Sequence, residues 1–246
     1  MILRFNYMKK FVITLVLIKL TFLFCFGALS FSSFQPPVLS QAKPAPTATP
    51  QRDDNINRPV SEPFTGDPSF FEDANRAEKL QIERVMDVLN IQPGKSVADI
   101  GAGSGFFTIR AAKRVGDSGK VYAVEINQDF INYINERAKR ENFSNIQTVL
   151  GAEDNPNLSA NSVDAVLILN AYHEIAQPIK LLKNLRPALR KGGLVGIIDR
   201  NGRGDDHGID KEKVIEEAKA AGFELAGDYD FVKYERIDYF LVFQAK

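Results

Sequence analysis

The sequence predicts an α/β fold: a doubly wound, mostly parallel sheet that carries an antiparallel strand at one edge. Short apolar runs, typical of buried strands, alternate with helical patterns from residue 97 to residue 198, as they do in parallel sheets covered by helices. A glycine-rich turn directly follows the first of these runs, residues 97–100. The last two segments, residues 223–229 and 239–244, have the alternating or apolar pattern of strands, and we expect the end of the chain to add an antiparallel strand at one edge of the sheet.

The N-terminal segment has the residue order of an export signal. Arg4, Lys9 and Lys10 precede an apolar run at residues 11–29. We therefore expect residues 1–30 to be a signal peptide or a membrane anchor. Basic residues before such a segment place the rest of the chain outside the cytoplasm, so the protein is predicted to be exported, periplasmic or tethered to the membrane on its extracytoplasmic side. If the segment is not a true signal, the protein is cytoplasmic.

Composition sets the domain boundaries and excludes several kinds of partner. Residues 31–63 are rich in proline, serine and threonine and predict a disordered linker, which leaves residues 64–246 for the folded domain. Lysine plus arginine and aspartate plus glutamate number 31 each, so no basic excess indicates binding to nucleic acid. Cys25 is the single cysteine, and the only histidines are His173 and His207, so no metal centre is expected.

The first half of the domain shows five elements in order. Residues 71–90 carry apolar side chains at helical spacing and predict a helix that packs on the sheet. After the strand at residues 97–100, a helical pattern runs from residue 107 to residue 115 and ends at glycines. A second buried strand and a polar-faced helix follow at residues 121–126 and 129–141.

The second half continues the alternation. Residues 146–150 and 163–169 are apolar runs and predict the third and fourth strands. Residues 181–189 predict a helix that two glycines stop, and residues 194–198 predict the fifth strand. A charged amphipathic helix at residues 211–221 then precedes the two final strands.

The turn after the first strand has the features of a ligand-binding loop. Asp99 ends the strand, and Gly101, Gly103 and Gly105 follow at every second position. Glycine tolerates positive φ and has no Cβ, so a ligand can approach the backbone closely, and the next helix points its positive N-terminus at the same place. A dinucleotide fingerprint would have its third glycine one residue later, where this chain has Phe106.

A second acidic residue lies where an adenosine-binding unit needs one. Glu125 ends the second predicted strand, about twenty residues after Gly105. At that offset in βαβ units an acidic side chain binds the ribose hydroxyls. We therefore predict that Glu125 contacts a ribose.

The pattern DxGxGxG resembles motif I of the class I S-adenosylmethionine (SAM) methyltransferases, and the run LRPALRKGGLVGIID resembles their motif around the fifth strand. The resemblance covers residues 70–246 and is closest to small bacterial methyltransferases with an export signal. It implies the Rossmann-like class I methyltransferase fold and SAM as cofactor. It also implies that Asp99 faces the methionine part of SAM, that the glycines pass under its sugar and tail, and that an acid after the third strand contacts adenine. Of the acids there, Asp154 is the predicted contact, and Asn170 completes the cofactor set.

The acceptor is expected where the fourth strand ends, because ligands of open α/β sheets bind outside the carboxyl ends of the strands. Tyr172 and His173 follow that strand. His173 titrates in the range of a general base, and Tyr172 is predicted to orient the acceptor or to pack on adenine, whereas His207 is expected to be solvated. The sequence thus predicts a SAM-dependent methyltransferase with a small-molecule acceptor. The alternatives are a non-catalytic SAM- or nucleotide-binding domain and a nicotinamide-dependent oxidoreductase.

Overall fold

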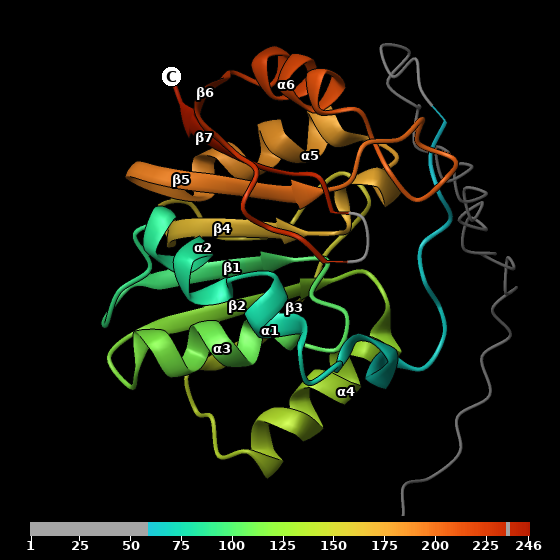
Figure 1. Ribbon diagram of the computed structural model, residues 1–246. Coiled ribbons are helices and arrows are strands. Elements are labelled where there is room, and N and C mark those ends of the chain that lie inside the picture. The colour runs from blue at the N-terminus through green and yellow to red at the C-terminus, as the bar shows by residue number, and fades with distance from the viewer. Residues whose placement is uncertain (1–58, 235–236) are drawn as a thin grey trace, which may run out of the picture. The chain divides into compact units, whose positions relative to one another are not determined.

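The computed structural model describes residues 59–234 and 237–246, so the predicted signal segment and most of the predicted linker lie outside the described residues. The described chain forms a seven-stranded sheet in the order β3-β2-β1-β4-β5-β7-β6 (Figure 1). Strands β1 to β5 are parallel, and β7 runs antiparallel to both β5 and β6. This order confirms the predicted fold class. The strands are β1 (Ser96–Ile100), β2 (Lys120–Glu125), β3 (Ile146–Leu150), β4 (Val163–Leu169), β5 (Leu189–Asp199), β6 (Phe223–Tyr229) and β7 (Tyr239–Ala245).

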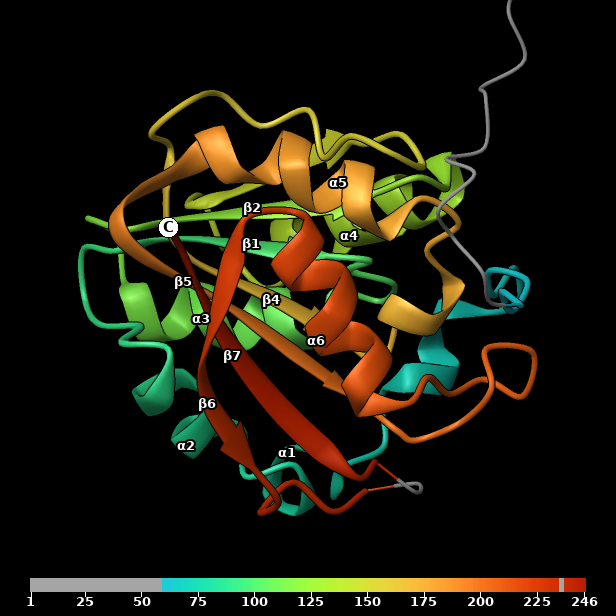
Figure 2. The same cartoon turned by 90° about the horizontal axis from the view of Figure 1, so that it is seen from above.

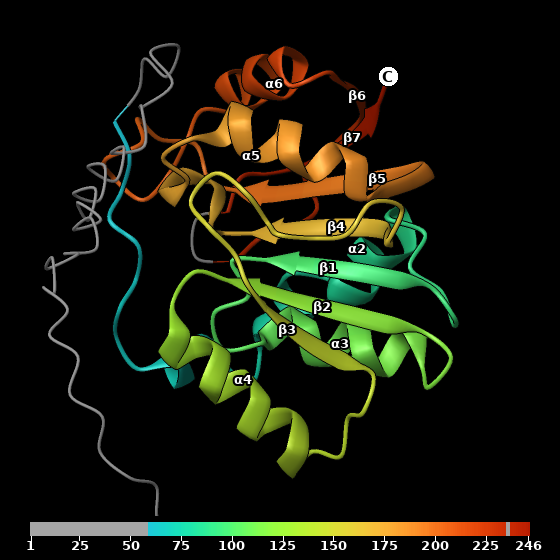
Figure 3. The same ribbon diagram turned by 180° about the vertical axis from the view of Figure 1, so that it is seen from behind.

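Helices cover both faces of the sheet. α1, α2 and α3 lie on one face and α5 and α6 on the other (Figures 1 and 3), and the view from above separates the two layers (Figure 2). Among the described helices, none has the length and apolarity needed to cross a bilayer. The α-helices are α1 (Arg76–Lys79), α2 (Ile82–Val88), α3 (Phe106–Val115), α4 (Gln128–Arg140), α5 (Pro178–Leu185) and α6 (Lys211–Ala220).

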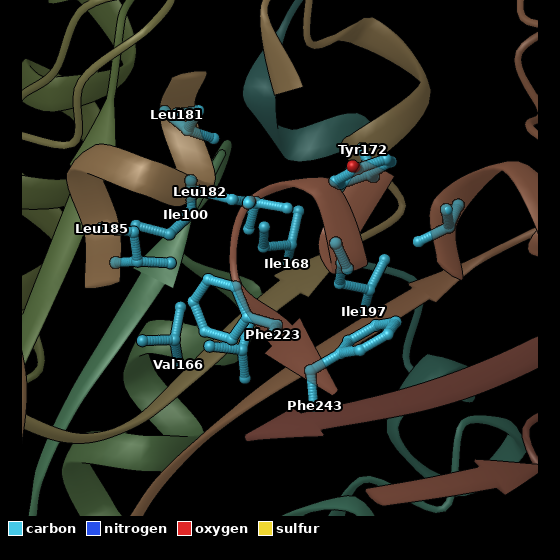
Figure 4. Packing of buried hydrophobic residues seen from close by; sticks show 14 of the residues in the cluster. Ile100, Val166, Ile168, Tyr172, Leu181, Leu182, Leu185, Ile197, Phe223 and Phe243 are labelled. Atoms are coloured by element: carbon cyan, nitrogen blue, oxygen red, sulfur yellow. The ribbon is translucent and has the colours of Figure 1, made fainter. Parts of the chain in front are cut away.

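The largest part of the core lies between the sheet and α5. Val166 and Ile168 of β4 pack there against leucines such as Leu182 (Figure 4). Their neighbours Ala165 and Leu167 belong to the cluster on the opposite face, because successive strand residues point to opposite sides of a sheet. β4 is therefore buried on both faces, which explains its continuous apolar sequence. Burying one such aliphatic side chain contributes about 1.5–3 kcal/mol.

The helix predicted over residues 71–90 is broken into shorter pieces. A 3₁₀ turn at Pro68–Phe71 precedes α1, and Gln81, with φ 48°, separates α1 from α2. The side-chain amide of Gln81 donates a hydrogen bond of 2.8 Å to the carbonyl of Phe231. A pattern that reports only which residues are apolar cannot predict this long-range contact at the break.

The boundary between α5 and β5 also differs from the prediction. α5 begins at Pro178, three residues early, and ends at Leu185 before a 3₁₀ turn. Pro187 has no backbone N–H, so it cannot donate the α-helical hydrogen bond to the carbonyl of Lys183, and the α-helix gives way to the 3₁₀ turn. The glycines predicted to stop the helix lie instead inside β5, where the register with β4 shifts between Val163 and Ala165.

The carboxyl ends of β1, β2, β4 and β5 meet at one edge of the sheet, as expected for a ligand site. The segment at residues 59–71 crosses this edge and is coloured cyan in Figure 1. Its first five residues belong to the predicted linker, yet Ser61 is buried. The hydroxyl of Ser61 donates to the carbonyl of Gly204 at 2.6 Å.

Candidate active site

A cavity of about 1050 Å³ opens at this edge of the sheet. Its walls come from the loops that follow β1 to β5 and from the segment at residues 60–71. Six of the predicted cofactor and catalytic residues gather there: Asp99, Gly101, Gly103, Glu125, Asn170 and His173. The topology thus brings together residues that the sequence separates by as many as 74 positions (173 − 99).

The glycine loop has the conformation that its sequence predicts. Gly101, Gly103 and Gly105 have φ of 71°, 53° and 77°, in the left-handed region that favours glycine. A Cβ on Gly101 would lie 2.7 Å from the Cβ of Ala171. Gly105 does not line the cavity: it precedes α3, and a Cβ there would lie 3.3 Å from Ile134. Its part is to start the helix.

Asp99 is buried beneath the glycine loop, with 2% of its surface exposed. The hydroxyl of Thr108 donates to its carboxylate at 2.6 Å. Burial raises the pKa of Asp99 to about 7, and the negative charge of Glu125 acts in the same direction, whereas the hydrogen bonds from Thr108 oppose both. A buried carboxyl group with a raised pKa is one that a positively charged ligand would stabilise in its ionised form.

Glu125 fixes the glycine loop from the end of β2. One carboxylate oxygen accepts a hydrogen bond from the backbone N–H of Gly103 at 3.0 Å. The other accepts from the N–H groups of Ile126 at 2.7 Å and Asn127 at 3.1 Å. An ionised carboxylate has about four acceptor positions, so one remains for a ribose hydroxyl.

The predicted adenine contact lies outside the cavity. Asp154 forms an ion pair with Lys180, and its carbonyl accepts a hydrogen bond of 2.8 Å from Asn184. Ala152 and Glu153 line the cavity in its place. Asn170 does line it, with φ 52°, and its N–H donates to the carbonyl of Ile198 at 2.7 Å.

His173 lines the cavity from a 3₁₀ turn after β4, and it is 2% exposed. Its Nδ1 is 2.9 and 3.0 Å from the two carboxylate oxygens of Asp199, and its backbone N–H donates to the same carboxylate at 3.1 Å. Asp199 is fully buried. Because a carboxylate accepts, Nδ1 carries the proton of this contact, and in the neutral imidazole Nε2 is the nitrogen with the lone pair. The arrangement therefore holds Nε2 ready to accept a proton or to bind a ligand.

Glu174 and His207 complete this side of the cavity. Nε2 of His173 lies 3.8 Å from a carboxylate oxygen of Glu174. Burial raises the pKa of Glu174 to about 7; His173 opposes this shift, while the negative charges of Glu125 and Asp199 add to it. The imidazole of His207 is perpendicular to that of His173, with 5.9 Å between ring centroids. Sequence reasoning missed this group because its members come from two distant loops.

Tyr172 is placed differently from its predicted role. Its side chain is fully buried among the residues beside α5 rather than in the cavity. Its hydroxyl donates to the carboxylate of Glu217 in α6 at 2.9 Å. Tyr172 therefore supports the turn that carries His173 and does not face the acceptor space.

The segment at residues 60–71 forms one wall of the cavity, although its first four residues were predicted as linker. The ring of Phe64 packs on Phe71 and Phe130, with centroids 4.9 and 6.3 Å apart. Just beyond the segment, Glu72 accepts a hydrogen bond of 2.6 Å from Ser104 and forms an ion pair with Arg137. The segment thus covers the glycine loop, and its signal in the sequence is its density of phenylalanine.

Comparison with known proteins shows which proteins this chain resembles. Residues 97–193, from β1 into β5, match the model of a family described as "Methyltransferase domain". The demethylmenaquinone methyltransferase of Geobacillus sp. (strain WCH70) is 26% identical over 113 residues, which are 46% of this chain and 48% of that protein. The chain thus spans about half the length of the curated relatives it matches.

Solved structures show the same fold. A SAM-dependent methyltransferase from Aquifex aeolicus aligns with a TM-score of 0.65 at 23% identity, covering 73% of this chain and 98% of that one. Fibrillarin from Aeropyrum pernix, solved with natively bound SAM, aligns with a TM-score of 0.53 at 18% identity, covering 68% and 74%. Together with the glycine loop between Asp99 and Glu125, these matches show that the chain has the class I methyltransferase fold and support SAM as its cofactor.

Proposed function

We propose that this protein transfers the methyl group of SAM to a small-molecule acceptor that binds beside His173. The observation that carries the proposal is that one cavity holds both the glycine loop with its two acids and the buried His173–Asp199 pair. Its volume of about 1050 Å³ is at the upper end of the range of about 300–1,000 Å³ for small-molecule sites. It therefore has room for a cofactor and a small acceptor together.

The residues of the cavity fit the cofactor. Gly101 and Gly103 line it with φ values that favour glycine, so backbone can lie close to a ligand. Glu125 would hold the ribose, and Asp99 would face the positively charged methionine end. Bound SAM supplies an electrophilic methyl group, which the lone pair of the acceptor takes while the electron pair of the broken C–S bond returns to sulfur.

The residues on the acceptor side handle the proton. When the acceptor loses a proton, Nε2 of His173 receives it, and Asp199 stabilises the resulting imidazolium across the bond at 2.9 Å. The buried side-chain oxygen of Gln177 also lines the cavity and has no hydrogen-bond partner among the described residues. Since buried polar groups are normally paired, this oxygen supports an acceptor that carries a hydrogen-bond donor.

Calorimetry on the full chain tests the cofactor. We expect SAM and its demethylated product to bind, and NAD not to bind. Transfer of labelled methyl to candidate acceptors then tests turnover, and demethylmenaquinone, which gives the relatives their name, is the first to try. SAM binding without transfer to any acceptor would favour the non-catalytic binding domain. NAD binding without SAM binding would favour the oxidoreductase and contradict the proposal.

Glu125→Ala is expected to weaken SAM binding about ten- to a hundredfold, because charge-assisted hydrogen bonds contribute about 1.5–3 kcal/mol. Part of this loss would come from the glycine loop, since Gly103 donates to Glu125. Glu125→Gln separates the loss of the ribose contact from the loss of the loop contact. Its amide oxygen can still accept from Gly103, so a larger loss of SAM affinity in Glu125→Ala measures what the contact to the glycine loop contributes. Calorimetry on both variants gives the comparison, and an unchanged dissociation constant in both would reject the ribose role.

A further inference from the structure

Two imidazoles and one carboxylate meet at the acceptor side of the cavity. His173, Glu174 and His207 each offer one ligand atom, and these atoms lie within 4.8 Å of one another. One pair, Nε2 of His173 and a carboxylate oxygen of Glu174, is 3.8 Å apart. Two ligands about 2.0–2.2 Å from one tetrahedral zinc ion are about 3.4 Å apart. Small side-chain rotations would therefore bring the three atoms to one ion.

We propose that His173, Glu174 and His207 bind one divalent transition-metal ion, with a coordination position open to the cavity. Two imidazoles and a carboxylate with a free position form a known donor set of catalytic Zn²⁺ sites. The imidazoles disfavour Mg²⁺ and Ca²⁺, which prefer oxygen ligands. The composition argued against a histidine-built centre because the chain has only two histidines, but both lie in this cluster.

Asp199 gives His173 the orientation of a metal ligand. Histidines that bind metals usually donate their other ring N–H to a carboxylate or a carbonyl, which fixes the tautomer. Nδ1 of His173 has such a partner in the fully buried carboxylate of Asp199 at 2.9 Å. Nε2, on the opposite side of the ring, is left for the ion.

The loop that carries His207 is held in place from several sides. The N–H of His207 donates to the hydroxyl of Ser61 at 3.0 Å. The guanidinium of Arg200 donates to the carbonyls of His207 and Asp206, the latter at 3.1 Å. The N–H of Gly204 donates to the carbonyl of Gly208 at 2.7 Å. The third ligand is therefore positioned by backbone contacts although its side chain is exposed.

The inference goes beyond the proposed methyl transfer and depends only on the three side chains. A bound ion would use the lone pair of Nε2, so it would replace His173 as the means by which the acceptor loses its proton. An acceptor oxygen or sulfur in the open position would have its pKa lowered by the ion and release its proton to solvent. The bound acceptor would thereby stay next to the cofactor side of the cavity.

Metal titration of the full chain, purified without a histidine tag, tests the inference. We expect one Co²⁺ per chain by visible ligand-field absorption, displaced by Zn²⁺ and not by Mg²⁺. Asp199→Asn changes the partner of a ligand and should weaken metal binding by about 10–100-fold, the loss typical of such changes. His207→Ala and Glu174→Gln each remove a ligand and should weaken metal binding by more than that. Glu153→Gln is the matched control, because Glu153 lines the same cavity outside the cluster. Cys25 is retained in every variant, so it cannot explain a difference between them.

Two outcomes would overturn the inference: no binding of Co²⁺ or Zn²⁺ by the folded wild-type chain, or equal binding by wild type and His207→Ala. Circular dichroism on each variant shows whether it is folded, and Glu174→Gln provides a second measurement if His207→Ala is not. Calorimetry with SAM on the same preparations keeps the two proposals apart. Metal binding without SAM binding would support this inference and contradict the proposed function. SAM turnover without metal binding would support the proposed function and contradict this inference.

Discussion

His173→Ala is expected to leave SAM binding nearly unchanged and to reduce turnover by about 10²–10⁴-fold, the usual contribution of a positioned acid or base. The side chain lines the cavity after β4, and its buried contact is with Asp199. Calorimetry with SAM and a single-turnover rate on one preparation give both quantities. The expected loss holds whether Nε2 accepts a proton or binds an ion, and His207→Ala separates those roles because it leaves the His173–Asp199 pair intact.

Tyr172→Phe is the matched control for this experiment. Tyr172 neighbours His173 in the same turn, is fully buried and bonds Glu217 rather than facing the cavity. Its variant should lose thermal stability, because the carboxylate of Glu217 loses a buried partner, and should keep near-normal turnover in the folded fraction. A stable His173→Ala protein with full activity would remove His173 from the mechanism. Equal losses of turnover in the two variants would show that the turn, and not the imidazole, is what matters.

The part of the cavity's geometry that the sequence indicated is local. Asp99 and the glycines are neighbours in one turn, and that turn's conformation follows from the absence of Cβ at Gly101 and Gly103. Glu125 lies one βαβ unit further on, at an offset set by the length of a helix and a strand. Short-range geometry of this kind is carried by residue type and spacing.

The parts that the sequence did not predict depend on long-range placement. Asp154 and Glu153 are adjacent, and which of them faces the cavity is decided by the ion pair between Asp154 and Lys180 of α5. His207 was expected to be solvated, and it is exposed, but its backbone N–H donates at 3.0 Å to the hydroxyl of Ser61, from a segment predicted as linker. Neither contact has a signature in periodicity or composition, because each joins segments at least 26 positions apart (180 − 154).

Asp99→Asn should have the second large effect, and it should act on the cofactor. Asp99 is 2% exposed, so its ionised carboxylate and the positive methionine end of SAM would form a buried charge pair. Removing one partner of such a pair costs about 2–5 kcal/mol, which corresponds to a loss of affinity of about 30- to several thousandfold. Asparagine keeps the size of the side chain and can still accept the hydrogen bond from Thr108. Calorimetry with SAM measures the loss.

The pH dependence of Asp99 distinguishes this role from a structural one. Burial raises its pKa to about 7 from the ordinary 3.8, so the folded protein holds a proton that the unfolded chain releases. The stability that Asp99 contributes is therefore complete below about pH 4 and is lost as the pH rises through about 7. The pKa of Glu174 is also raised. The quantity to measure is therefore the difference in free energy of unfolding between wild type and Asp99→Asn, because the contribution of Glu174 cancels in that difference.

Affinity for SAM should change with pH in the opposite sense, because the cation binds the ionised form of Asp99. Wild-type affinity should rise as the pH increases through about 7 and level off above it, whereas Asp99→Asn should lack that rise. In the same range, the free energy of unfolding of unliganded wild type should fall relative to that of the variant. A variant that loses affinity equally at pH 6 and pH 8 would show that Asp99 acts through the shape of the glycine loop. A variant that binds SAM as tightly as wild type at pH 8, where Asp99 is ionised, would remove Asp99 from the cofactor site.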